Sequence, residues 1–127
     1  MATEENIRVI IVDDNDHVRM GLSIVLENFD DITLVGEAAS GQEAIELCTM
    51  LEPDVVLMDL IMPQMDGITA TRLIHEKYPS MGIVVLTSNL DPEARNSAFQ
   101  AGASSFMLKV VGIDEIATAI RTSYQST

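Results

Sequence analysis

Short apolar runs alternate along this chain with longer segments in which apolar residues recur every three or four positions. The runs are rich in β-branched residues and are bounded by turn-forming residues, which is typical of strands. The periodic segments are typical of helices with one apolar face. The runs predict strands over 7–12, 32–37, 55–59, 83–86 and 105–108, the second being a weak strand at a sheet edge. The periodic segments predict helices over about 18–29, 41–51, 67–78, 91–101 and 113–124.

The strict alternation of strands and helices determines the expected architecture. Alternating β and α units form parallel sheets with helices on both faces, and right-handed crossovers make such domains doubly wound. We therefore predict a single α/β domain over residues 1–127, a flavodoxin-like (βα)5 three-layer sandwich with strand order 2-1-3-4-5.

The predicted third strand, Val55-Val56-Leu57-Met58-Asp59, is apolar up to its last residue. Such a run fits a strand buried on both faces. An unpaired charge in the middle of that strand would be too costly, so Asp59 belongs at its C-terminal end. Ligands bind at this edge of open α/β sheets.

Other strands also end in reactive groups. Asp13 and Asp14 follow the first strand, Thr87 the fourth and Lys109 the fifth. All of these ends lie at one edge of a parallel sheet, and the predicted order sets the first and third strands side by side. The carboxylates would repel one another without a cation. A hard divalent cation and Lys109 would balance them, and Asp59 is the best candidate nucleophile for aspartyl-phosphate chemistry.

Composition narrows the possible partners. Seven basic residues stand against 20 acidic ones, a formal net charge of −13, which disfavours nucleic-acid binding by this segment and suits a cation. The single cysteine, Cys48, is expected to be a buried, inert thiol. There is neither a signal-peptide pattern nor an apolar run long enough to span a membrane, so we expect a cytoplasmic protein without membrane contact.

Taken together and in order, these motifs resemble the receiver domain of bacterial two-component response regulators over essentially the whole chain. They are Asp13-Asp14, Asp59 with Met62-Pro63 and Asp66-Gly67, Thr87-Ser88, and Lys109. The stretch from Gly102 to Lys109 further resembles the NarL/FixJ (LuxR-type) subfamily of transcription regulators.

The resemblance implies a role for each matching residue. Asp59 would accept a phosphoryl group from a sensor histidine kinase. Mg2+, or alternatively Mn2+, would be bound by Asp14, Asp59 and the backbone carbonyl of Ile61, and more loosely by Asp13. Lys109 and Thr87 would contact the phosphoryl oxygens. Thr87 and Phe106 would then rearrange and change the surface formed by the fourth helix, the fifth strand and the fifth helix.

Two departures from the family pattern affect this interpretation. Val110 follows the lysine where proline is frequent, and the chain stops just after its last predicted helix. We expect it to be a piece of a longer regulator with a helix-turn-helix DNA-binding domain, rather than a free-standing receiver. The domain would act as a switch and not as a turnover enzyme. Homodimerisation on phosphorylation could use the first and fifth helices, or the surface around the fourth helix.

Other function classes fit less well. A flavin carrier would need a phosphate-binding loop where this chain has Asp13-Asp14-Asn15-Asp16. A haloacid-dehalogenase-type phosphatase would need a second aspartate at position 61, which is isoleucine. An unphosphorylated receiver-like interaction module remains open.

The remaining candidate residues are interpreted as surface positions. His17 and His75 have no partner at metal-ligand spacing. Arg19, Arg72 and Arg95 fall on predicted helix surfaces, where contact with solvent is the default.

Overall fold

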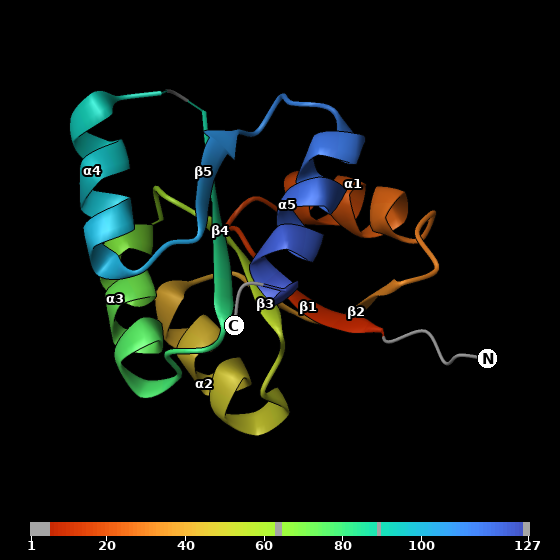
Figure 1. The fold of residues 1–127 in the computed structure, drawn as a ribbon, viewed down its shortest axis with the longest axis horizontal. Helices are drawn as coiled ribbons and strands as arrows, with labels where there is room; N and C mark the ends of the chain where they lie inside the picture. The colour runs from red at the N-terminus through yellow and green to blue at the C-terminus, as the bar shows by residue number, and fades with distance from the viewer. Residues whose placement is uncertain (1–5, 63–64, 89, 126–127) are drawn as a thin grey trace.

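The computed structural model describes residues 6–62, 65–88 and 90–125. In this part of the chain, five parallel strands form one sheet in the order β2-β1-β3-β4-β5 (Figure 1). The predicted strand order and three-layer architecture are thereby confirmed. The strands are β1 (Ile7–Val12), β2 (Ile32–Ala38), β3 (Val55–Asp59), β4 (Gly82–Thr87) and β5 (Ser105–Leu108). The helices are α1 (Asp16–Leu26), α2 (Gly41–Leu51), α3 (Gly67–Lys77), α4 (Pro92–Ala101) and α5 (Ile113–Gln125).

Side chains alternate between two apolar layers, one on each face of the sheet. In β3, Val56 and Met58 join the layer beneath α2, α3 and α4, while Val55 and Leu57 join the layer beneath α1 and α5 (Figure 1). Because successive strand residues point to opposite faces, a strand covered on both sides has to be apolar throughout. This is why every residue of β3 is buried.

The boundaries of the first helix differ from the prediction. Asn15 caps α1, and its side chain accepts hydrogen bonds from the backbone N–H groups of His17 and Val18, so the helix begins at Asp16. It ends at Leu26, and Phe29 packs on the α1–α5 side of the core from the following turn. The apolar periodicity therefore continued past the last helical residue.

Two polar side chains have structural roles that the sequence did not reveal. Arg8 of β1 donates from Nη1 to the carbonyls of Leu51 and Glu52 at 2.7 and 3.0 Å, and so caps the C-terminal end of α2. His75, predicted at the surface, is half-buried, and its ring lies against Gly102, where an added Cβ would come within 2.3 Å of the ring. Cys48 is fully buried, as predicted, and burial raises its pKa to about 11.

A bidentate ion pair ties α5 to the turn between α1 and β2. Arg121 donates to both carboxylate oxygens of Asp31 at 2.7 and 2.9 Å and lies 5.3 Å from the centre of the Phe29 ring. The hydrogen bond from Arg121 lowers the pKa of Asp31, despite the opposing effect of burial. The ionised pair is thus more stable in the folded chain than in the unfolded one.

The start of α3 packs unusually closely against the end of β3. The backbone N–H of Gly67 donates to the carbonyl of Leu60 at 2.7 Å, and a Cβ on Gly67 would lie 2.1 Å from the carbonyl oxygen of Asp59. Asp66 caps the helix by accepting from the N–H of Thr69. Only glycine allows the helix to begin here.

We predict that Arg121→Ala lowers the free energy of unfolding by about 0.5 kcal/mol at pH 7, a small value because both partners are more than a third exposed. The folded-state pKa of Asp31 is depressed, so its contribution is present above the carboxyl's unfolded pKa and is lost as the pH falls through the folded value. Urea unfolding at pH 7 and in acid should therefore show the two proteins converging in acid. Arg72→Ala, at an exposed position of α3, is the control. A gap that persists unchanged in acid would contradict the prediction.

We predict that Gly67→Ala destabilises the domain by about 1–3 kcal/mol or more, because the added methyl group meets backbone atoms that cannot move independently. The matched control is Gly21→Ala in α1, where nothing lies within 4 Å of an added Cβ. That change should raise the unfolding free energy by about 0.5–1 kcal/mol through helix propensity. Urea denaturation followed by circular dichroism measures both. If the two substitutions changed the free energy of unfolding equally, the close contact between Gly67 and the backbone of Asp59 would not require glycine.

Candidate functional site

Asp59 is the last residue of β3, and its carboxylate lies at the carboxyl edge of the sheet. The residue is only 5% exposed. Its position follows from the rest of β3, since four buried apolar residues fix the strand and leave the charge at its end. The backbone N–H of Ile61 favours the charged carboxylate and lowers its pKa, against the larger effect of burial. Asp59 is thus held in place, with its charge largely removed from water.

Asp13 follows the neighbouring strand β1 and is 3% exposed. Its backbone N–H donates to the carbonyl of Ala38 in β2 at 3.0 Å, and its Oδ1 accepts from the N–H of Asn15 at 2.8 Å. Asp14 is exposed. Oxygen atoms of Asp13, Asp14 and Asp59 lie within 4.8 Å of one another. The structure therefore brings together the three carboxylates that the sequence placed at this edge.

Lys109 follows β5 and reaches across to both buried acids. Its Nζ lies 2.9 Å from Oδ1 of Asp59 and 3.0 Å from Oδ2 of Asp13. Burial alone would lower the pKa of Lys109, but the hydrogen bonds to Asp59 and Asp13 outweigh that effect and raise it. The ammonium therefore stays charged and is shared between two carboxylates.

One shared lysine does not fully compensate Asp59. Burial raises the pKa of the Asp59 carboxyl, and the charge of Asp13 raises it further, while the hydrogen bonds from Lys109 and Ile61 oppose this rise. The net direction of the pKa shift is upward, mainly because burial disfavours the charged carboxylate. By formal charge, one lysine also faces two buried carboxylates. Three clustered carboxylate oxygens are the donors that a hard divalent cation such as Mg2+ prefers, so the site's chemistry fits one.

The other predicted site residues come to the same region. Thr87 ends β4, is 2% exposed, and accepts at its carbonyl from the N–H of Lys109 at 2.8 Å. Phe106 of β5 pairs in register with Val85 and is half-buried against the core. The side chain of Ile61 is 70% exposed. The role of the Ile61 backbone carbonyl as a metal ligand stays a prediction. Pro63 of the predicted motif lies outside the described residues.

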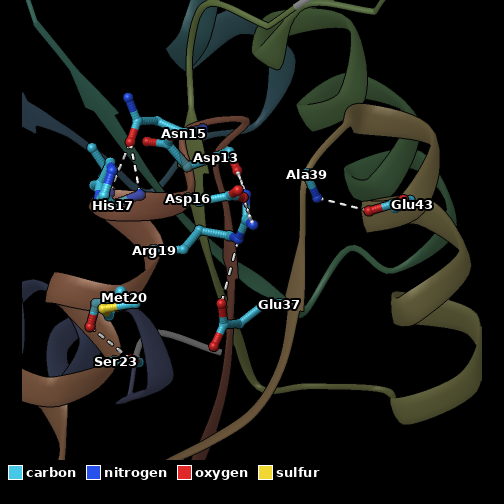
Figure 2. Close-up of polar contacts among 11 residues, drawn as sticks. Asp13, Asn15, Asp16, His17, Arg19, Met20, Ser23, Glu37, Ala39 and Glu43 are labelled. Carbon is cyan, nitrogen blue, oxygen red and sulfur yellow. Dashed lines mark hydrogen bonds and ion pairs between the residues drawn. The ribbon is translucent and has the colours of Figure 1, made fainter.

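Arg19 contradicts the prediction of a solvent-facing arginine. Its side chain is 15% exposed and lies between α1 and β2, against the loop that carries Asp13 and Asp14 (Figure 2). The sequence signal was weak, because an arginine one turn into a helix is ordinary. Only its short distance from Asp13-Asp14 distinguishes it from Arg72 and Arg95.

Comparison with known proteins gives consistent relatives. A model of the response regulator receiver domain matches residues 9–121. The transcriptional regulatory protein LiaR of Bacillus subtilis is 46% identical over 117 residues, which cover 92% of this chain and 56% of LiaR. The response regulator protein VraR of Staphylococcus saprophyticus is 41% identical over 120 residues, covering 94% of this chain and 57% of VraR. The chain thus spans a little over half the length of these relatives.

Solved structures agree with the sequence matches. The signal receiver domain of the response regulator NarL from Mycobacterium tuberculosis superposes with a TM-score of 0.91 at 30% identity, covering 97% of this chain and 99% of that one. A LuxR-family two-component response regulator from Aurantimonas sp. SI85-9A1 superposes with a TM-score of 0.90 at 33% identity, covering 95% of this chain and 86% of that one. None of the helices in the described residues combines the length and apolar character needed to cross a bilayer. The chain belongs to the receiver domains of two-component response regulators, in their NarL/LuxR-type subfamily.

Proposed function

We propose that this receiver domain is a Mg2+-dependent phosphoacceptor switch in which Asp59 takes a phosphoryl group from the phosphohistidine of a sensor histidine kinase. The observation that carries the proposal is the buried Asp59 carboxylate, 2.9 Å from the Lys109 ammonium and clustered with two further carboxylates. A positioned carboxylate nucleophile with a divalent cation and a lysine is a known solution for forming an aspartyl phosphate.

The proposed transfer is a displacement at the phosphorus atom. An oxygen of Asp59 attacks phosphorus, the bond from phosphorus to the histidine nitrogen breaks, and the imidazole leaves with its electron pair and is protonated. The Lys109 ammonium, which lies within 3.0 Å of both buried carboxylates, would pair with the negatively charged phosphoryl oxygens. The Thr87 hydroxyl would donate a hydrogen bond to the same oxygens. Mg2+ held by Asp13, Asp14, Asp59 and the Ile61 carbonyl would neutralise phosphoryl charge, and Mn2+ offers similar ligand chemistry.

Phosphorylation would be transmitted through Thr87 and Phe106. Lys109 joins Thr87 through a backbone hydrogen bond, and Phe106 borders a cavity with Leu90, Pro92 and Arg95 at the start of α4. A rearrangement of these two side chains would change the surface of α4, β5 and α5 and shift a two-state equilibrium. The domain would thus act as a switch, with catalysis confined to its own phosphorylation and dephosphorylation.

The output we propose is control of transcription through an attached helix-turn-helix domain, in a cytoplasmic regulator longer than this chain. The basis is the printed name of LiaR, a transcriptional regulatory protein, of which the chain matches 56%. Contact with DNA would belong to the attached domain, because this one carries a net charge of −13. Dimerisation on phosphorylation would use α1 with α5, or the α4, β5 and α5 surface.

The test is intact mass after incubation with acetyl phosphate and Mg2+. The wild-type chain should gain about 80 Da, one phosphoryl group, and Asp59→Asn should not. Asp30→Asn, which removes an exposed carboxylate, should gain the same mass as wild type. Omitting Mg2+ should abolish the gain. If wild type binds Mg2+ but gains no mass, the domain is an unphosphorylated interaction module instead.

A second prediction concerns stability without a cation. Asp59→Asn should raise the free energy of unfolding in EDTA at pH 7 by on the order of 1 kcal/mol, because it removes a desolvated charge while Lys109 keeps its pairing with Asp13. Asp30→Asn should change it little. Urea denaturation of the three proteins measures this. A clear loss of stability in Asp59→Asn would mean that Asp59 is already fully compensated.

A further inference from the structure

We propose that Arg19 is a positioning residue for the acidic site, holding the β1–α1 loop in the conformation that brings Asp13 and Asp14 together with Asp59. This inference rests on the proposed Mg2+ site, and it concerns a side chain that is not one of the predicted metal ligands. Arg19 lies one helical turn beyond Asn15, the N-cap of α1, and its backbone N–H donates to the Asn15 carbonyl at 3.1 Å.

The guanidinium of Arg19 serves three acceptors on three parts of the fold (Figure 2). Its Nη1 donates to the backbone carbonyl of Asp13 at 2.5 Å, and its Nη2 pairs with the Asp16 carboxylate. Its Nε lies 3.4 Å from Oε1 of Glu37 in β2. A guanidinium holds its donors in a rigid planar fork and so binds several acceptors in fixed directions, whereas an ammonium is a compact charge on a flexible stem.

These contacts close a ring of interactions around the loop. Asp13 donates its backbone N–H to the carbonyl of Ala38, and Ala38 follows Glu37, the residue that Arg19 contacts. Both backbone polar groups of Asp13 are thus hydrogen-bonded. Its N–H donates to Ala38 of β2, and its carbonyl accepts from Arg19. The Asp13 carboxylate, bound to Lys109 and the Asn15 N–H, has its direction fixed from both sides.

Asp14 depends on this arrangement more than Asp13 does. It is exposed, and no hydrogen bond or ion pair from the described residues holds its side chain. The backbone of the loop therefore sets where its carboxylate lies. Because Arg19 binds the loop at the carbonyl of Asp13, the residue before Asp14, loss of this side chain would loosen Asp14 first.

Two physical effects of Arg19 on cation binding have opposite signs. Removing a positive charge next to an acidic cluster favours a divalent cation by simple electrostatics. Releasing the loop weakens binding, since ligand-orienting contacts outside the coordination sphere typically contribute about 10–100-fold in metal affinity. If Arg19 is a positioning residue, the second effect is larger.

The experiment is calorimetric titration of MgCl2, with MnCl2 as a second probe, into wild type, Arg19→Gln, Arg19→Lys and Arg72→Gln. We expect Arg19→Gln to weaken Mg2+ binding about tenfold. Arg19→Lys should also weaken it, because it keeps the charge and loses the fork. Arg72→Gln, the same charge change at an exposed position of α3, should bind Mg2+ as tightly as wild type or slightly more tightly. All titrations are done at a temperature well below the unfolding midpoint of each variant. A lower stability of the variant then does not by itself lower its affinity for Mg2+.

Amide hydrogen exchange at Asn15 gives a second readout. Its N–H donates to Oδ1 of Asp13, so exchange should accelerate in both Arg19 variants and not in Arg72→Gln. Unchanged or tighter Mg2+ binding in Arg19→Gln would overturn the inference, as would full affinity in Arg19→Lys with unchanged exchange. Failure of wild type itself to bind Mg2+ would instead overturn the proposed function, so the two failures are distinguishable.

Discussion

The Lys109 ammonium, shared between two buried carboxylates, is the interaction on which the functional edge of this domain depends. It joins the ends of three strands, because Lys109 follows β5 while Asp59 ends β3 and Asp13 follows β1. Two carboxylates this close would otherwise repel each other in a region that water scarcely reaches. One cation for two acids keeps the edge folded but leaves it with excess negative charge. That excess is the physical basis of the divalent-cation site that we propose.

The proposed cation binding and phosphorylation would both depend on the same incomplete neutralisation of the buried carboxylates. The raised pKa of Asp59 shows that its charge is held at a cost to the folded state. Ligands that bind only the folded state stabilise it, so a bound cation would offset that cost. A fully compensated site would be more stable but less able to accept a cation and a phosphoryl group. If the site works as proposed, it is a further case of a functional site that lowers the stability of the folded state.

The surroundings fix the geometry of this edge through contacts that carry no chemistry of their own. Gly67 lets α3 begin against the carbonyl of Asp59. Arg19 ties the β1–α1 loop to β2, and Asn15 caps α1 at the same loop. Each of these residues acts on a carboxylate through the backbone beside it. Small changes at such positions are expected to alter the site without touching a ligand atom.

The sequence by itself determined the strand order, the two-layer burial of β3 and the identity of the residues at the sheet edge. These follow from short-range rules: an apolar run with a terminal charge has one sensible placement, and alternating strands and helices allow few topologies. Family resemblance then supplied the roles of Asp59, Thr87 and Lys109, and the comparisons with known proteins bear out the family.

The tertiary structure alone decided how single polar side chains are shared. Arg8 is an interruption in an apolar strand when read from sequence, yet it caps a helix more than 40 residues away. Arg19 and His75 look like surface residues but are partly buried, because Arg19 lies against Glu37 of β2 and His75 lies against Gly102. The pairing of one lysine with two acids is of the same kind. The spacing of apolar residues predicts which face of a helix or strand a residue occupies. It does not predict which distant residues the side chain contacts, because these are brought close only by the tertiary fold.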